Sequence, residues 1–219
     1  MRAMGAIVAG LASLCAACGS LLETKLPEST SYVIAPAPAS STGVMRSTAD
    51  LSIGRPDLAP GLDTERIAVL KGRQLDYYRG AQWGGRTVEV VQTLLVDSFE
   101  DQQLFRSVTA EQSRVSSEYV LDVSVRDFQA EYASDGSAPT AHVTIFGRLI
   151  RVVDRELVDT FTATAQSRAT ENRMEAVSAA FETAAQKVVL ELAQKTATAI
   201  AGDAEKLRAA GGEAQSTQQ

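Results

Sequence analysis

The chain has 219 residues, 45% of them hydrophobic, which is enough for one domain with an ordinary buried core. Its formal net charge of −6 and the absence of any run of Lys or Arg exclude an electrostatic binder of nucleic acid, because phosphate contacts need a concentrated basic surface. No nucleic-acid partner is therefore expected.

Residues 1–17 are typical of a bacterial export signal. Arg2 supplies a positive start, and no charged residue occurs from Ala3 to Ala17. This uncharged stretch is shorter than the roughly 20 residues that a helix needs to span a bilayer. The pattern therefore favours export followed by removal of the segment, with an uncleaved signal anchor as the alternative.

Cys18 follows the small pair Ala16-Ala17 in a segment, LASLCAACGSLL, that resembles a lipobox, in which the cysteine after the cleavage site is acylated. A lipobox prefers Leu three residues earlier, where this chain has Cys15. Cys15 is the poorer acceptor, because bulky Leu14 would precede it. A zinc or redox motif lacks partners, since the sequence has no further Cys and one His. The sequence therefore predicts lipidation at Cys18.

The residue after Cys18 is Gly19, and the lack of Asp at that position resembles lipoproteins sorted to the outer membrane. Residues 19–30 have no clean hydrophobic period and predict a tether, which reaches at most about 40 Å when extended and about 20 Å as a flexible coil. We therefore expect a domain that faces the periplasm and is held at the outer membrane by acyl chains such as palmitate.

The first half of the expected domain, which covers residues 31–201, combines short strands with one helix. Apolar or alternating runs predict the strands, and apolar residues at every third or fourth position predict an amphipathic helix. The expected elements are strands at residues 32–34, 66–70 and 74–78 and a helix at residues 87–102 with the apolar residues Val88, Val91, Leu95 and Phe99.

A long alternating strand is expected at residues 118–132. Its apolar residues share one face as far as Val125 and change to the other face at Phe128. A slip of one residue in a two-residue period is what a β-bulge produces, so we predict a bulge near Arg126 and Asp127.

A long hairpin is predicted from strands at residues 141–153 and 157–167, with Leu157 and Phe161 on the buried face of the second strand. The charged residues 154–156 (DRE) form its turn, not a catalytic pair of carboxylates. The turn is therefore expected to be structural.

The last element is a helix at about residues 173–200, with Asn172 and Glu175 as a capping box and Gly202 at its end. The polar residues 202–219 are expected to be disordered. The order β-β-α-β-β-β-α implies an α+β domain, in which two main helices pack on one face of a largely antiparallel sheet.

Three large aromatic residues, Tyr77, Tyr78 and Trp83, lie within the stretch DYYRGAQWGG at residues 76–85. In one interpretation, one Tyr packs under a helix and Trp83 caps the sheet edge, where the Gly pair turns the chain. In the other, at least one Tyr and Trp83 stay partly exposed and bind a partner protein. Both can hold together, because adjacent strand residues point to opposite faces.

Catalysis has little support in the sequence. His142 is the single histidine and shares a strand face with Thr144, which is typical of a surface or rim position. The serine nucleophile elbow, the phosphate-binding loop and the H-E-x-x-H zinc motif do not occur. We therefore expect no catalytic residue, no metal site and no cofactor.

Five segments carry a resemblance to a known family, and they run in order through about residues 30–200: GLDTERIAVL, LDYYRGAQW, VQTLLVDSFED, YVLDVSVRDFQAEY and NRMEAVSAAFETA. They resemble the ABC-type transport auxiliary lipoproteins, which include Pqi-type outer-membrane lipoproteins that accompany MCE-domain lipid transport systems. After Trp83 the family tends to carry Ala and an acidic residue, whereas this chain has GGR at residues 84–86.

The resemblance implies a non-catalytic auxiliary subunit with an MCE-domain protein and an ABC permease and ATPase as partners. It also permits a homo-oligomer. Acylated Cys18 would contact outer-membrane lipid. The alternative function is a general envelope-assembly or structural lipoprotein with no role in transport, and a lipid-modifying enzyme is a third reading without an obvious catalytic residue.

Overall fold

The computed structural model describes residues 29–39, 46–133 and 135–216. The predicted export signal, Cys18 and the tether up to residue 28 lie outside these ranges. Within the described ranges, no helix has the length and apolar character that a membrane span requires.

The structure combines a β-sheet with two main helices, which confirms the expected α+β fold class. In chain order they are β1 (Thr30–Tyr32), β2 (Asp50–Ile53), β3 (Asp57–Leu58), β4 (Arg66–Lys71), β5 (Gln74–Trp83), α2 (Thr87–Asp101), β6 (Ser107–Ala110), the 3-10 helix η1 (Glu111–Ser113), β7 (Tyr119–Glu131), β8 (Thr140–Arg151), β9 (Glu156–Arg168) and α3 (Met174–Ser216).

The described strands form one mixed, open sheet around β7. On one side β7, β8 and β9 make long antiparallel pairs. On its other side β7 meets β2, β3 and β4 in short parallel pairs, and β4 and β5 form an antiparallel hairpin. The predicted antiparallel character therefore holds for the long pairings, while the short ones are parallel.

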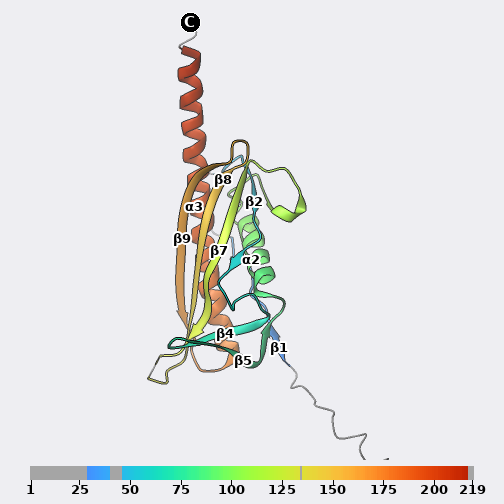
Figure 1. The fold of residues 1–219 in the computed structure, drawn as a ribbon, viewed down its shortest axis with the longest axis vertical. Coiled ribbons are helices and arrows are strands. Elements are labelled where there is room, and N and C mark those ends of the chain that lie inside the picture. Colours follow the sequence, from blue (N-terminus) through green and yellow to red (C-terminus); the bar gives the residue numbers. More distant parts are fainter. Residues whose placement is uncertain (1–28, 40–45, 134, 217–219) are drawn as a thin grey trace, which may run out of the picture.

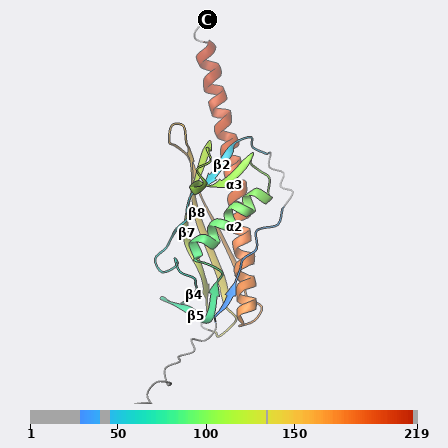
Figure 2. The same cartoon turned by 90° about the vertical axis from the view of Figure 1, so that its right-hand side faces the viewer.

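Both main helices cover the same face of the sheet, as predicted. Figure 2 shows α2 and α3 side by side, with β7 and β8 behind them. The apolar residues predicted for α2 are all buried. At the centre Trp83, Phe128 and Phe181 pack together, with ring centroids 5.1–5.6 Å apart.

Two bulges set the register of the long strands. The predicted one in β7 lies between Val125 and Asp127 and is confirmed. The second lies in the β8–β9 pair beyond Leu149 and was not predicted. It turns Leu157 away from the face of Phe161, so the expectation that Leu157 is buried was wrong: its side chain is 52% exposed.

The helix α3 does not end at Gly202. It continues to Ser216 and projects beyond the sheet (Figure 1), so the prediction of disorder from residue 202 was wrong. Residues 203–210 (DAEKLRAA) are mostly strong helix formers, and Gly202 does not have a positive φ, so nothing breaks the helix there. Just before the N-terminal end of α3, the predicted capping residue Asn172 accepts a 2.7 Å hydrogen bond at Oδ1 from the Tyr132 hydroxyl.

The segment Ala35–Pro38 passes between α2 and α3, and side chains from both helices hold its backbone. Ser98 Oγ accepts a hydrogen bond from Ala37 N at 2.9 Å, and Gln102 donates to Pro38 O at 3.0 Å. From α3, Glu182 accepts from Ala35 N at 2.9 Å and Gln186 donates to Pro36 O at 3.1 Å. We call this segment the strap.

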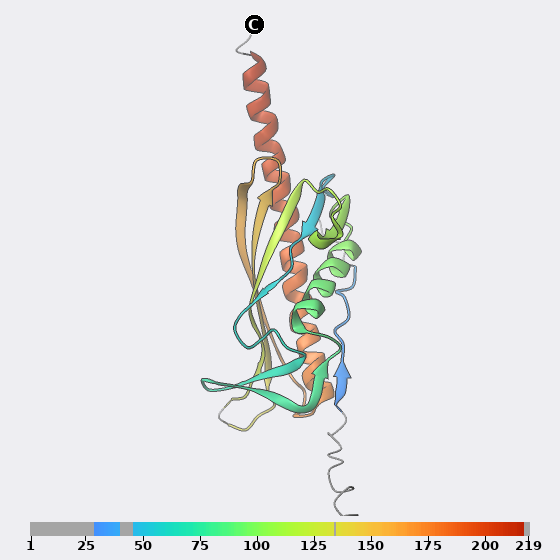
Figure 3. The same cartoon turned by 45° about the vertical axis from the view of Figure 1, so that its right-hand side comes forward.

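The molecule is elongated, and its two ends differ (Figures 1 and 3). At the tether end lie β1, where the described chain begins, and the β4–β5 hairpin, which crosses the long axis. At the distal end lie the β8–β9 turn and the projecting part of α3. These two names are used below.

Candidate functional site

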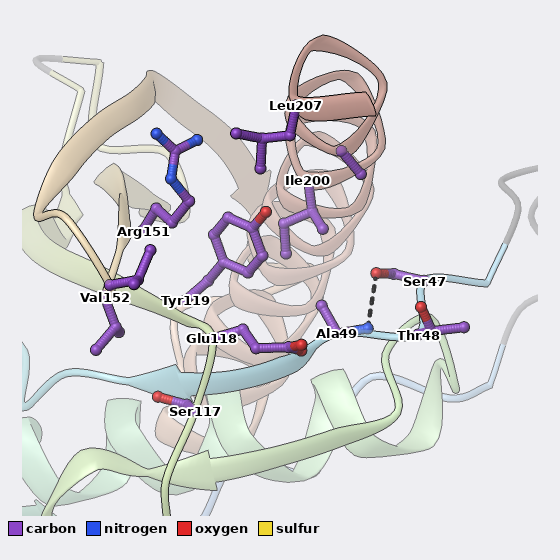
Figure 4. A pocket seen from close by; sticks show the side chains of 12 residues that line it. Ser47, Thr48, Ala49, Ser117, Glu118, Tyr119, Arg151, Val152, Ile200 and Leu207 are labelled. Atoms are coloured by element: carbon purple, nitrogen blue, oxygen red, sulfur yellow. Dashed lines mark hydrogen bonds between the residues drawn. The ribbon is translucent and has the colours of Figure 1, made fainter. Parts of the chain in front are cut away.

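A cavity of about 390 Å³ opens at the distal end. Its walls come from the starts of β2 and β7, from the β8–β9 turn and from α3, as Figure 4 shows. We call it the distal groove. Its lining residues are Ser47, Thr48, Ala49, Ser117, Glu118, Tyr119, Arg151, Val152, Val153, Ile200, Ala204 and Leu207.

One wall of the groove is an apolar face of α3. Ile200, Ala204 and Leu207 lie four and three residues apart, which places them on one side of the helix. Ile200 is buried at the edge of the core, whereas Leu207 is 48% exposed because α3 has left the sheet at that point. The apolar stripe of α3 therefore runs out of the core and into the groove.

The β8–β9 turn adds two exposed valines to the groove mouth. Val152 is 43% exposed and Val153 is 86% exposed. Scattered exposed apolar residues are common on proteins, but here they adjoin Leu207 around one cavity. A cavity with exposed apolar residues at its mouth is a candidate site for an apolar side chain or ligand.

Two lining residues of the groove, Tyr119 and Arg151, bind the carboxylate of Asp203, which does not itself line the cavity. Arg151 Nη1 donates to both oxygens of Asp203, at 2.6 and 2.7 Å, and its Nη2 donates to Asp154 at 2.7 Å. The Tyr119 hydroxyl donates to Asp203 at 2.8 Å. Figure 4 shows the Tyr119 ring between Arg151 and Ile200, with its hydroxyl toward α3. The start of β7, the end of β8 and α3 therefore meet at one carboxylate.

The surroundings of Tyr119, Arg151 and Asp154 shift the pKa of each of these groups. Burial, together with the neighbouring Asp203 carboxylate, raises the pKa of Tyr119 to about 12. Hydrogen bonds to Asp154 and Asp203 raise the pKa of Arg151, and Arg151 lowers the pKa of Asp154. A neutral phenol and a closed ion pair can hold a ligand's orientation, but they supply no group tuned for proton transfer near neutrality.

Metal binding finds no support in the described part of the chain, where no three His, Cys, Asp or Glu side chains are placed to share an ion. His142 lies on the outer sheet face, with Nε2 3.7 Å from Glu131 Oε2, and its side chain is 22% exposed. The residues 154–156 form the β8–β9 turn, where Asp154 is held by Arg151.

The sequence matches the family model described as the ABC-type transport auxiliary lipoprotein component, over residues 32–193. The chain belongs to this family. The family model thus covers the strap, the sheet, α2 and the first half of α3, while the projecting part of α3 in this auxiliary lipoprotein lies beyond the matched region.

Two solved structures share the fold of this auxiliary lipoprotein, and a third is only weakly similar. A protein from Xanthomonas campestris is similar with a TM-score of 0.75 and 27% identity, over 81% of this chain and 99% of that chain. An uncharacterized protein has a TM-score of 0.58 and 14% identity, over 76% and 99%. The PelC dodecamer from Paraburkholderia phytofirmans is more distant, with a TM-score of 0.43 and 15% identity, over 71% and 95%. No curated protein matches this chain.

The structure separates the three predicted aromatic contact residues of this auxiliary lipoprotein. Trp83 is 1% exposed between Phe128 and Phe181, so the partly exposed ring that partner binding needs is not found at this position. The ring packs inside the core and does not cap the sheet edge, which is where the packing interpretation placed it. The sequence could not decide this, because the aromatic rings that pack on Trp83 lie 45 and 98 residues away in the chain.

Tyr77 and Tyr78 are both half-buried in the β4–β5 hairpin. The Tyr77 hydroxyl donates to Gly61 O at 2.9 Å, and the Arg66 guanidinium lies 3.9 Å from its ring centroid. The Tyr78 hydroxyl lies 3.3 Å from that of Tyr132. Neither ring is fully in the core, because the hairpin crosses the long axis and its tip lies to one side of the helices (Figure 3).

The distal groove was missed in the sequence because its walls come from four separate stretches of chain. A partial signal existed: Val152 and Val153 directly precede a charged turn, and apolar residues continue past Gly202 at helical spacing to Leu207. Neither shows by itself that the stretches meet.

Proposed function

We propose that this auxiliary lipoprotein is a non-catalytic subunit that joins the outer membrane to an MCE-type ABC lipid transport system. Acylated Cys18 holds it at that membrane, facing the periplasm, and the distal groove receives an apolar segment of the MCE-domain protein, which works with an ABC permease and ATPase. The family membership supports the transport role, and the lipobox supports the anchor.

The observation that carries this proposal is the separation of the two ends. The described chain begins at the tether end, whereas the distal groove with its exposed valines and Leu207 lies at the other end (Figure 1). A protein tethered at one end presents the opposite end to the periplasm, where a transport component would meet it.

A site-specific crosslink tests the docking. A photo-reactive amino acid replaces Val153 in the full-length protein, and Thr183, an exposed residue in the first half of α3, serves as the control position. We expect the MCE-domain protein to be captured from position 153 and not from position 183. Capture from both positions alike, or from neither, would refute the docking site.

The anchor has its own test. Cys18→Ala should abolish labelling by a fatty acid and release a folded protein into the periplasm, while Cys15→Ala should leave both labelling and membrane fractionation unchanged. Outer-membrane fractionation of the Cys18→Ala protein would contradict the anchor without affecting the docking site.

A general envelope-assembly lipoprotein is the second candidate, since the same two-ended shape suits any partner. Crosslinks from position 153 to assembly components, together with a gene neighbourhood that lacks a permease, an ATPase and an MCE protein, would favour it.

A homo-oligomer remains part of the proposal, and the mass of the detergent-solubilised protein in analytical ultracentrifugation would test it. Tyr77 and Tyr78 remain proposed contact residues for a partner protein.

A further inference from the structure

We propose that the β4–β5 hairpin is a second membrane contact, which rests on an anionic lipid surface beside the anchor. The hairpin lies at the tether end and runs across the long axis of the molecule (Figure 3). Its strand β5 pairs with β1, with Thr30 opposite Ala81, so the chain from Cys18 arrives at the hairpin itself. The proposal rests on the anchoring proposed above.

The charge of the hairpin is opposite to that of the whole chain. Residues 66–79 contain four basic residues and one acidic residue, in a protein whose net charge is −6. Lys71, Arg73 and Arg79 are exposed, and none of them makes an ion pair with a described residue. These cations are therefore available to lipid phosphates.

The tight turn at residues 71–74, which forms the tip of the hairpin, holds Lys71 and Arg73 away from the body of the domain. Lys71 pairs with Gln74 across a two-residue turn in which Gly72 has a φ of 62°, a conformation that glycine adopts without strain and that a tight hairpin requires. No heavy atom lies within 4 Å of the position that a Gly72 Cβ would occupy. The tip is open to whatever surface faces it.

Apolar and aromatic side chains accompany the charges. Leu75 is 37% exposed near the tip, and the half-buried Tyr77 and Tyr78 follow it. Tyrosine suits the boundary between lipid headgroups and acyl chains, because its ring is apolar and its tip is polar. Basic residues with an exposed Leu and tyrosines are the combination by which peripheral proteins hold a membrane surface.

A membrane is favoured over an acidic protein as the occupant because of the tether. The predicted tether of residues 19–30 spans at most about 40 Å, so the tether end cannot move far from the bilayer. A basic surface kept this close meets a high local concentration of lipid phosphate, and each Lys or Arg near an anionic surface strengthens contact by about fivefold.

The test uses the full acylated protein on lipid vesicles. Leu75→Cys carries an environment-sensitive dye, since no other free thiol remains once residues 1–17 are removed and Cys18 is acylated. Val153→Cys carries the dye at the distal end as a control. On vesicles with 30% phosphatidylglycerol, we expect a blue shift and higher intensity at position 75, none at position 153, and none on pure phosphatidylcholine.

The charges are tested with matched variants. Lys71→Gln, Arg73→Gln and Arg79→Gln together should abolish the response at position 75, as should 0.5 M salt. The control variant combines Lys187→Gln, Lys206→Gln and Arg208→Gln, all on exposed parts of α3, and should keep the response.

The outcomes separate this proposal from the anchor. Flotation with phosphatidylcholine vesicles reports the acyl anchor alone, and its failure would overturn the anchor and the hairpin contact with it. Flotation without any response at position 75 on anionic vesicles would overturn the hairpin contact only. A response that arises only when the MCE-domain protein is added would overturn it in favour of a protein partner.

Discussion

The guanidinium of Arg151 meets both carboxylate oxygens of Asp203, at 2.6 and 2.7 Å, although the two residues are 52 positions apart in the chain. Their side chains are 13% and 8% exposed. Because Arg151 also holds Asp154 in the β8–β9 turn, the pair connects that turn to α3 at the point where the helix leaves the sheet. It therefore shapes the distal groove.

Breaking this pair from one side should destabilise the protein more than removing it completely. Asp203→Leu leaves Arg151 with Asp154 as its remaining carboxylate and takes the acceptor from the Tyr119 hydroxyl. Adding Arg151→Met removes a guanidinium that is 13% exposed and has lost one of its two carboxylates, so the double variant should unfold at a higher urea concentration than Asp203→Leu alone. Equal or lower stability of the double variant would contradict this account.

Alkaline pH should weaken the fold through Tyr119. Its pKa is about 12 in the folded protein, above the ordinary value of 10, because of burial and Asp203. The unfolded chain loses this proton near pH 10 while the folded chain keeps it, so the contribution is complete below pH 10 and is lost as pH rises from 10 to 12. Urea unfolding across this range should show a smaller decline for Tyr119→Phe than for the unchanged protein. An equal decline would contradict the assignment.

Trp83→Ala should act on stability and not directly on partner binding. The ring is 1% exposed between Phe128 and Phe181, and removing a buried aromatic side chain costs about 3–5 kcal/mol. Urea unfolding would measure the loss, and Trp83→Phe should recover part of it. A stable Trp83→Ala protein with weakened partner binding would show that the ring is exposed in solution.

Gly202→Ala should stabilise the protein by about 0.5–1 kcal/mol, because α3 runs through this position and Gly is a poor helix former. Open space surrounds the new methyl group, so no clash opposes the gain. If the helix instead ended at Gly202 in a left-handed conformation, Ala would destabilise it. Urea unfolding followed by circular dichroism distinguishes the two.

Gly147→Ala should have the opposite effect. A Cβ at Gly147 in β8 would lie 2.8 Å from Phe161 Cε2 and 3.2 Å from a Leu121 methyl group. Overpacking of this kind costs about 1–3 kcal/mol. In the double variant Gly147→Ala/Phe161→Leu, the smaller Leu side chain should restore part of the lost stability, as measured by urea unfolding. If no stability is restored, the clash is not with Phe161.

Local periodicity predicted the elements that carry their own pattern. The helix α2 and the bulge between Val125 and Asp127 both follow from the order of apolar and polar residues in one stretch of chain. The strands β2, β3 and β6 were missed, because two to four residues in parallel pairs show no period. Leu157 was misplaced because the β8–β9 bulge depends on how two strands pair.

The candidate sites divide in the same way. The aromatic residues of the β4–β5 hairpin are neighbours in sequence, so their clustering was visible, whereas the basic residues are spread among them and form no run. The distal groove joins Ala49, Tyr119, Arg151 and Ile200, and only the tertiary fold brings them together. The part of the groove formed by α3 beyond residue 202 was not predicted, because a glycine after a helical pattern ordinarily marks the end of the helix.

The strap determines where a mechanical load on the anchored end would fall. A force that draws the domain away from its bilayer passes along the chain into Ala35–Pro38, which Ser98 and Gln102 grip from α2 and Glu182 and Gln186 grip from α3. The edge strand β1 precedes the strap and pairs with β5, so this edge pairing carries the force first. If β1 separates, the strap transfers the force to both helices before it reaches the central strands of the sheet.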